Sequence, residues 1–197
     1  MKQSLNAKYW DNRYLDNDSP WDMGQVSPPL KVYFDQLINK DSSILIPGAG
    51  NAYEAEYLVK NGFTNVFVCD YAAAPLQNLL QRCPEIKAEN LLLEDFFKMN
   101  NKKFDLIIEQ TFFCAIDPSL RKKYFEKMNE LLNTNGKLVG LLFNDMTLND
   151  DKPPFKGNME EYKAYFKDIF KIKVYETAYN SLKPRAGREL FINLVKI

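Results

Sequence analysis

The sequence predicts an α/β fold, in which helices cover both faces of a doubly wound, mostly parallel sheet of seven strands. From residue 43 onward, short apolar segments of strand length alternate with amphipathic segments of helix length, as they do in parallel sheets with crossover helices. The last two apolar segments flank a polar loop that contains glycine, so they are expected to pair as an antiparallel hairpin at the sheet edge. A chain of 197 residues has the length of one ordinary domain.

The first predicted strand and helix meet at a glycine turn. Ile44–Pro47 is an apolar run that ends in proline and is followed by Gly48-Ala49-Gly50, and proline is tolerated at a strand end. A helix is expected over residues 52–60, because Asn61-Gly62 behind it supplies a C-terminal cap. Further strands are expected at Val66–Asp70, Leu91–Leu93, residues 104–109, residues 137–143, residues 171–178 and residues 189–195.

Proline and glycine also place the next two helices. One helix is expected over Ala73–Arg82, since Pro84 stops it. Asp117-Pro118 supplies an N-cap and a first helical residue for a helix that continues to Leu132. Asn135-Gly136 is expected to terminate that helix.

The remaining segments complete a single domain that spans residues 1–197. Residues 144–157 form a polar loop that is long enough to be a lid or a substrate wall. The last helix is expected over residues 159–170. Residues 1–40 are rich in aromatic side chains, and we expect them to form an N-terminal extension that lies against the domain.

Composition and charge exclude several classes of protein. Lysine plus arginine equals aspartate plus glutamate, 26 against 26, so no net field attracts nucleic acid. The apolar runs are far shorter than the roughly 20 residues that span a bilayer, and the N-terminal residues lack the apolar segment of a secretory signal. Three cysteines without close spacing and the absence of histidine argue against disulfides and a metal site. We expect a cytoplasmic protein, monomeric or weakly homo-oligomeric, that acts on a small molecule without nucleic-acid or membrane partners.

The glycine turn and the acid that ends the next strand predict a nucleoside ligand. Gly48 and Gly50 let a ligand approach backbone N–H groups at the start of a helix, and Asp70 is placed to accept hydrogen bonds from a ribose. Tyr53 occupies the position of the third glycine of a dinucleotide motif, and no P-loop motif occurs. S-adenosylmethionine, which contains adenosine but no pyrophosphate, fits these residues. The alternative is a β–α turn that needs glycine only for its backbone conformation.

Residues 46–54, Ile-Pro-Gly-Ala-Gly-Asn-Ala-Tyr-Glu, resemble the first motif of class I S-adenosylmethionine-dependent methyltransferases, which have a Rossmann-like fold. The Pro-Gly variant is similar to the thiopurine S-methyltransferase family, and in particular to its plant halide and thiol methyltransferases. Other segments resemble an N-terminal tryptophan motif, a fourth-strand motif and a proline loop of that branch. They are Trp10-x-x-x-Tyr14 with residues 19–25, residues 104–109 with residues 112–118, and residues 152–155.

The resemblance implies particular contacts for bound S-adenosylmethionine and for its methyl acceptor. Aromatic side chains would close over the cofactor, while glycines and acids would hold its methionine, ribose and adenine. The closing side chains would be Trp10, Tyr14 and Trp21, within a helical N-terminal cap that residues 1–40 form over the cofactor site. Gly48 and Glu109 would lie at the methionine portion, Gly50 would also contact the cofactor, Asp70 would lie at the ribose, Asp95 and Phe96 at the adenine, and Phe113 and Phe143 at the acceptor.

Three positions depart from the plant branch. Tyr14 stands in place of a tryptophan, Glu109 in place of an aspartate, and Phe143 in place of a tyrosine that lines the substrate site, so a hydroxyl is missing there. Without the resemblance, the aromatic residues are ordinary packing side chains. Arg185 and Arg188 are expected to be charges of a turn, although the resemblance places basic residues near the substrate opening.

The resemblance and the absence of histidine together predict methyl transfer to a small soft nucleophile, such as a thiol, sulfide, thiopurine-like molecule or halide. These acceptors carry no proton or are partly ionised near neutrality, so they need no imidazole base. Catalysis would then consist of positioning by the protein, without a dedicated catalytic residue. Two alternatives stay open: an O- or N-methyltransferase that uses a carboxylate base, and a non-catalytic nucleoside-binding module.

Overall fold

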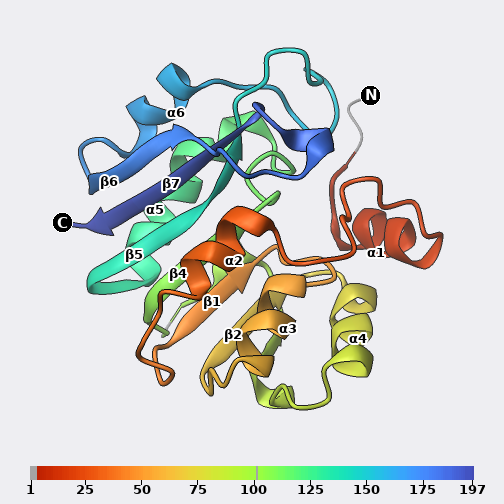
Figure 1. Cartoon of the computed structure of the whole chain (residues 1–197). Helices are drawn as coiled ribbons and strands as arrows, with labels where there is room; N and C mark the ends of the chain where they lie inside the picture. Colours follow the sequence, from red (N-terminus) through yellow and green to blue (C-terminus); the bar gives the residue numbers. More distant parts are fainter. Residues whose placement is uncertain (1–3, 101) are drawn as a thin grey trace.

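The computed structural model describes residues 4–100 and 102–197 and has a seven-stranded sheet at its centre (Figure 1). The strand order is β3-β2-β1-β4-β5-β7-β6. Strands β1 to β5 are parallel, whereas β7 runs antiparallel to both of its neighbours, which confirms the predicted fold class. The strands are β1 (Ile44–Pro47), β2 (Val66–Asp70), β3 (Leu91–Leu93), β4 (Phe104–Gln110), β5 (Leu132–Phe143), β6 (Phe170–Thr177) and β7 (Glu189–Lys196).

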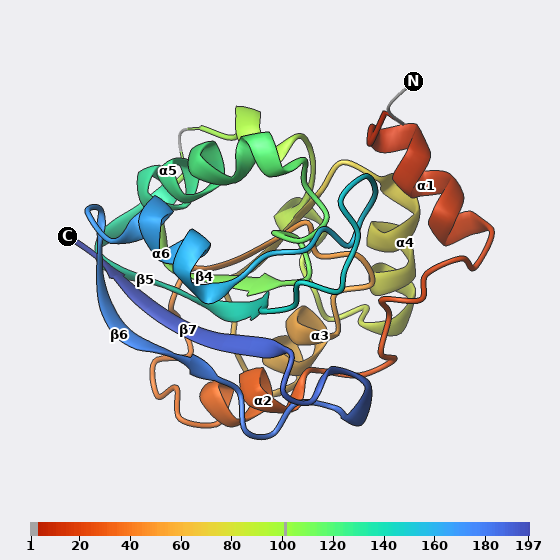
Figure 2. The same cartoon turned by 90° about the horizontal axis from the view of Figure 1, so that it is seen from above.

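Helices cover both faces of the sheet, and Figure 2 shows α5 and α6 on one face and α2 and α3 on the other. Two hydrophobic clusters fill the interfaces between these helices and the strands. The helices are α1 (Ala7–Leu15), α2 (Pro28–Phe34), α3 (Tyr53–Lys60), α4 (Ala73–Arg82), α5 (Arg121–Leu131) and α6 (Met159–Phe166). Short 3₁₀ helices lie at Ala88–Asn90, Phe96–Lys98, Pro118–Leu120 and Lys183–Arg185.

The alternation of side chains along β1 and β4 explains why there are two clusters. Leu45 and Ile107 join the cluster that contains α5 and α6, whereas Ile44, Ile46 and Ile108 join the cluster that contains α2, α3 and α4. All five side chains are at most 2% exposed, and burying each one stabilises the fold by about 1.5–3 kcal/mol. Because both faces of these strands are covered, their sequences are continuous apolar runs.

Most predicted elements have the expected bounds. β1, β2, β3 and α4 agree residue by residue, and the C-terminal hairpin of β6 and β7 is confirmed. α3 begins one residue late, because Ala52 is its N-cap in a left-handed conformation with φ of 52°. α6 ends at Phe166 instead of residue 170, because Phe170 already pairs with Lys196 in the sheet.

The prediction for residues 117–136 is wrong about the start of the helix and about the role of Asn135-Gly136, whereas the helix ends at Leu131, one residue before the predicted end. Asp117 caps the short 3₁₀ helix Pro118–Leu120 by accepting the Ser119 N–H (3.0 Å), and α5 begins only after it. Asn135 and Gly136 do not terminate α5; they lie within β5, where Asn135 has φ of 62° and the register against β4 shifts. A left-handed residue beside glycine occurs in β-bulges as well as at helix ends, so the local pattern does not separate the two.

The N-terminal segment divides into a docked helix and a core helix. α1 lies against α4, where the Ala74 N–H donates to Asp11 Oδ1 (2.8 Å). The Tyr71 hydroxyl donates to the Leu5 carbonyl oxygen (2.5 Å) and fastens the residues before α1. α2 belongs to the hydrophobic core, since its buried side chains join the cluster that contains α3 and α4.

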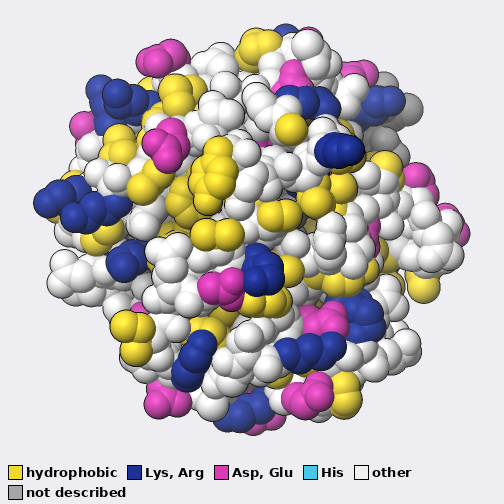
Figure 3. Space-filling model, in the orientation of Figure 1, with side chains coloured by type: hydrophobic (Ala, Val, Ile, Leu, Met, Phe, Trp, Pro, Cys, Tyr) yellow, Lys and Arg dark blue, Asp and Glu magenta, His cyan; other side chains and the backbone are white. Residues whose placement is uncertain are grey.

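The surface carries charges of both signs, and Figure 3 shows them interspersed on one face of the molecule. Within residues 4–100 and 102–197, no helix combines the length and the apolarity that crossing a membrane requires. The same described residues hold no group of three or more cysteine, aspartate or glutamate side chains that could bind a metal ion.

Candidate active site

A cavity of about 710 Å³ lies at the carboxyl ends of β1, β2 and β4, where parallel α/β sheets bind their ligands. Its volume is within the range of small-molecule sites, about 300–1,000 Å³. Side chains of α1 and of residues 20–25 cover one side of the cavity, and the loops at residues 148–155 and 184–188 close the other.

The glycine turn after β1 brings bare backbone to the cavity. Gly48 and Gly50 have φ of 55° and 52°, a left-handed conformation that glycine adopts without strain. A Cβ atom at Gly48 would lie 2.1 Å from the Phe112 ring, and one at Gly50 would lie 2.3 Å from the Tyr14 hydroxyl. Both positions therefore require glycine for space as well as for conformation.

Asp70 links the glycine turn to the start of α4. Its Oδ2 atom accepts the Gly50 N–H (3.1 Å) and its Oδ1 atom accepts the Ala72 N–H (2.9 Å). Burial raises the pKa of Asp70, while these N–H donors act in the opposite direction. The residue is 7% exposed and lines the cavity, and with three backbone donors its carboxylate still has acceptor capacity for a ligand.

Trp10, Tyr14 and Trp21 form an aromatic cluster above the glycine turn, which we call the aromatic flap. The Trp21 ring meets the Trp10 ring edge to face at 5.4 Å and the Tyr14 ring at 5.8 Å, and Trp21 Nε1 donates to the Tyr14 hydroxyl (3.2 Å). All three side chains line the cavity. Burial and the charge of Asp70 raise the pKa of Tyr14, so its hydroxyl stays neutral at physiological pH.

Arg185 joins the flap to the side of the cavity that Phe143 lines. It is 6% exposed, and it donates to the Trp21 carbonyl oxygen (2.5 Å) and to Glu189 Oε1 (3.2 Å). Its guanidinium lies 5.5 Å from the centre of the Phe143 ring. The interpretation as a turn charge is wrong for Arg185, because its side chain is buried in contact with the Trp21 backbone, Glu189 and the Phe143 ring. Arg188 pairs with Asp145 at the rim.

Asp95 and Phe96, the two residues expected at the adenine, follow β3 and line the cavity. Asp95 caps the 3₁₀ helix Phe96–Lys98 by accepting the Phe97 N–H (2.9 Å). The Phe96 ring packs edge to face against Phe112 at 5.4 Å. The apolar face at this end of the cavity is therefore continuous with the ring that covers Gly48.

Glu109 and Phe113 do not line the cavity, although both were expected to contact ligands. Glu109 is fully buried behind it: Oε1 accepts the N–H groups of Phe112 (2.8 Å) and Phe113 (2.9 Å), and Oε2 accepts the Tyr124 hydroxyl. Phe113 is 1% exposed and packs against Tyr124 and Tyr162. The position of these two residues indicates that they shape the turn after β4, because the turn itself separates them from the cavity.

The loop at residues 144–157, which we call the wall loop, closes the side of the cavity that Phe143 lines. Its ends meet where the Asp145 N–H donates to the Gly157 carbonyl oxygen (2.9 Å). In between, the Phe155 N–H donates to the carbonyl oxygen of Cys114 (2.8 Å), which also lines the cavity. Burial raises the pKa of the Cys114 thiol to about 12, so this thiol is neutral and unreactive.

Sequence reasoning missed Glu54, a buried acid in the first turn of α3. It is 6% exposed, lines the cavity and accepts the Ser27 N–H (3.0 Å). Burial raises its pKa. The signal that could have found it is its place at the end of the segment 46–54, which resembles the first methyltransferase motif.

The family of the chain follows from its sequence as a whole. The model of the thiopurine S-methyltransferase family matches residues 5–193. The chain belongs to the thiopurine S-methyltransferase family. Thiocyanate methyltransferase 1 of Brassica oleracea is 28% identical over 194 residues, which cover 96% of this chain and 85% of that protein. Probable thiol methyltransferase 2 of Arabidopsis thaliana is 27% identical over 158 residues, or 78% of this chain and 69% of that protein.

Solved structures agree with the class I methyltransferase fold. The 1,6-didemethyltoxoflavin-N1-methyltransferase of Burkholderia thailandensis, solved with 1,6-didemethyltoxoflavin and S-adenosylhomocysteine, superposes with a TM-score of 0.76 at 17% identity. The superposition covers 96% of this chain and 86% of that chain. As a member of the thiopurine S-methyltransferase family, the protein is an S-adenosylmethionine-dependent methyltransferase.

The residues at the cavity fit this cofactor. The glycine turn exposes backbone where no Cβ atom has room, and Asp70 presents a buried carboxylate with free lone pairs beside it. The aromatic flap supplies π-faces, which attract a cation such as a sulfonium.

Proposed function

We propose that this methyltransferase transfers the methyl group of S-adenosylmethionine to a small soft nucleophile of the thiol, sulfide, thiopurine-like or halide type. The observation that carries the proposal is the buried guanidinium of Arg185, which lines the cavity beside the Phe143 ring. The guanidinium is paired with the buried Glu189 and also donates to the Trp21 carbonyl oxygen. Its other N–H donors favour a small anion or a thiolate over a neutral acceptor. The thiocyanate and thiol methyltransferase names of the plant relatives support the same class of acceptor.

We further propose how the cofactor lies in the cavity. The glycine turn would hold its methionine end, and the acid after β2 would accept its ribose hydroxyls. The aromatic side chains would cover the sulfonium, and the residues after β3 would flank the adenine. These groups are Gly48 and Gly50 for the methionine end, Asp70 for the ribose, Trp10, Tyr14 and Trp21 for the sulfonium, and Asp95 and Phe96 for the adenine.

Positioning accounts for the catalysis in this proposal. S-adenosylmethionine, when bound, supplies a methyl group that its sulfonium already activates. The aromatic flap and the wall loop hold the acceptor and exclude water, and positioning of this kind contributes about 7–11 kcal/mol. Arg185 lowers the pKa of a bound thiol, because a neighbouring cation stabilises the thiolate. Tyr14 and Cys114, whose pKa values are both raised, stay protonated and do not compete as nucleophiles.

Glu54 favours a second candidate, an O- or N-methyltransferase with a carboxylate base. Its carboxylate is buried at the cavity, and the upward shift of its pKa is the direction that a general base working near neutrality needs. Oxygen and nitrogen acceptors lose a proton during methylation, so this candidate depends on Glu54 whereas the proposed function does not.

A methyl-transfer panel separates the two candidates. Iodide, sulfide, thiophenols and mercaptopurine are assayed beside catechols and amines, with the wild-type enzyme and with Glu54→Gln. We expect the soft acceptors to react. In Glu54→Gln, the kcat for these acceptors should stay within a few-fold of the wild-type value. A reaction with only oxygen and nitrogen acceptors, reduced about 10²–10⁴-fold in Glu54→Gln, would establish the second candidate. Calorimetry with S-adenosylhomocysteine verifies that the variant still binds the cofactor product.

A further inference from the structure

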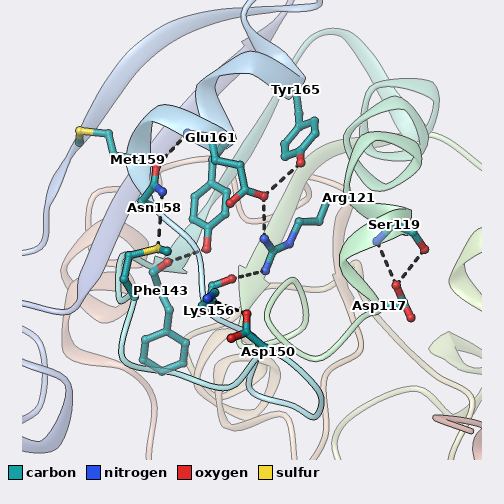
Figure 4. A network of polar contacts seen from close by, with 12 residues as sticks. Asp117, Ser119, Arg121, Phe143, Asp150, Lys156, Asn158, Met159, Glu161 and Tyr165 are labelled. Carbon is teal, nitrogen blue, oxygen red and sulfur yellow. Dashed lines mark hydrogen bonds and ion pairs between the residues drawn. The ribbon is translucent and has the colours of Figure 1, made fainter. Parts of the chain in front are cut away.

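Arg121 is a buried cation that does not line the cavity. It is 2% exposed and begins α5. Its Nη1 atom donates to Glu161 Oε1 in α6 (2.7 Å), and its Nη2 atom donates to the Lys156 carbonyl oxygen in the wall loop (2.7 Å) (Figure 4). One guanidinium thus joins the start of α5 to the wall loop, at a residue 35 positions further along the chain, and to α6, at a residue 40 positions further.

The surroundings of Arg121 indicate that its position serves these two contacts. The rings of Phe113 and Tyr162 lie 5.2 and 5.4 Å from the guanidinium carbon. Its Nε atom is buried without a hydrogen-bond partner among the described residues, and an unsatisfied buried donor is costly. Since a packed apolar side chain often stabilises a buried site as well as an ion pair does, the cation is better explained by what it holds in place.

The segment that Arg121 holds is the part of the wall loop that faces the cavity. Lys156 follows Phe155, which lines the cavity together with Pro153 and Pro154. The Lys156 N–H donates to the Asn149 carbonyl oxygen (2.9 Å) across the loop. Displacement of the Lys156 carbonyl group would therefore move the residues that set the width of the cavity.

The second contact of Arg121 reaches the end of β5 through α6. Glu161 also accepts the Tyr165 hydroxyl (3.0 Å), and its own N–H donates to the N-cap residue Asn158 (2.9 Å). The neighbouring Tyr162 hydroxyl donates to the Phe143 carbonyl oxygen (2.8 Å). Arg121 and Glu161 therefore act on both Phe143 and the wall loop, the two elements on the acceptor side of the cavity (Figure 4).

We propose that Arg121, together with Glu161, is a positioning residue that fixes the acceptor side of the active site. It acts through the wall loop and through Phe143 and does not touch substrate or cofactor. The inference rests on the proposed function only in that the wall loop must be the acceptor side. We call the contacts of Arg121 with Glu161 and with the Lys156 carbonyl oxygen the clamp. Loss of the clamp is then expected to weaken the selection of small acceptors and to leave cofactor binding intact.

Three variants and a control test the clamp. Arg121→Met replaces the guanidinium by an unbranched apolar side chain, Arg121→Lys keeps the charge but lacks the planar fork that meets both acceptors, and Glu161→Gln weakens one contact. Lys122→Met is the control, since it removes a cation from the next position of α5, where the side chain is 76% exposed. Each protein is measured for acceptor KM, for S-adenosylhomocysteine affinity by calorimetry, and for amide hydrogen exchange of residues 145–157.

We expect Arg121→Met to raise the KM of the smallest accepted substrate about tenfold, since a displacement of about 1 Å in an active site can cost up to about 100-fold in catalysis. Its amides at residues 145–157 should exchange faster, with cofactor-product affinity within twofold of wild type. Arg121→Lys should be intermediate and Lys122→Met unchanged. Wild-type KM and wild-type exchange in Arg121→Met, or an equal loss of acceptor and cofactor binding, would overturn the proposal.

Two further features of the test keep its outcomes distinct. If Arg121→Met does not fold, Glu161→Gln decides, because Glu161 is partly exposed at 33% and tolerates a neutral isostere. If the wild-type enzyme accepts only oxygen or nitrogen nucleophiles, the proposed function fails, and the same KM comparison is made with the acceptor that reacts. Hydrogen exchange needs no acceptor, so it reports on the clamp in either case.

Discussion

Replacement of Glu109 by glutamine perturbs a fully buried carboxylate behind the active site. Burial raises the pKa of Glu109 from its ordinary value of 4.5 to about 7, against the opposing effect of the donors Tyr124, Phe113 and Phe112. Glutamine has nearly the same shape. Its amide oxygen can accept both N–H groups, and its NH₂ group can donate to the Tyr124 hydroxyl, which is able to accept. The variant thus removes the titration and keeps the contacts.

The sign and size of the effect follow from proton linkage. Between pH 4.5 and about 7 the folded state holds a proton on Glu109 that the unfolded state has released, so the free energy of unfolding falls as the pH rises through this interval. At about 1.4 kcal/mol per pH unit, the interval corresponds to about 3 kcal/mol. The contribution of Glu109 to stability is complete below pH 4.5 and is lost above pH 7.

The assay is chemical denaturation at several pH values from 4.5 to 8. Other buried acids, such as Glu54 and Asp70, have raised pKa values and shift stability in the same direction, so the informative quantity is the difference between wild type and Glu109→Gln. We expect the variant to gain about 3 kcal/mol relative to wild type between pH 4.5 and 7. Glu126→Gln, on the exposed side of α5, controls for loss of a surface charge. Parallel stability curves for wild type and Glu109→Gln would refute the reasoning.

Three further predictions concern the cofactor side of the site. Asp70→Ala should weaken cofactor binding by about 1–3 kcal/mol, and unchanged affinity in calorimetry would show that the ribose is held elsewhere. Gly50→Ala should weaken cofactor binding more than it destabilises the fold, because its Cβ atom would lie 2.3 Å from the Tyr14 hydroxyl of the flap. The matched control for backbone strain alone is Gly62→Ala, since Gly62 has φ of 85° and open space around its Cβ position. Asp11→Ala removes the acceptor of the Ala74 N–H and should loosen α1, with a cost of about 0.5–2 kcal/mol as for a lost helix cap; limited proteolysis that finds α1 equally protected would contradict this.

The succession of strands and helices along the chain could be predicted from the sequence, and so could several segments that line the cavity. Ile44–Pro47, the glycine turn and Asp70 are each recognised from their neighbours along the chain, because an apolar run, a positive φ and an acid at a strand end are local properties. The same holds for the C-terminal hairpin. The bulge at Asn135 was misread because its local pattern also suits a helix end.

Only the tertiary structure decided which polar residues are enclosed and what they hold. Arg185 meets the Trp21 carbonyl oxygen from 164 residues away, and Arg121 reaches α6 and the wall loop in the same manner. Glu109 lies behind the cavity because the turn after β4 folds over it. A charged side chain is solvated in any local segment, and its burial depends on distant segments that pack around it, so no pattern along the chain records it.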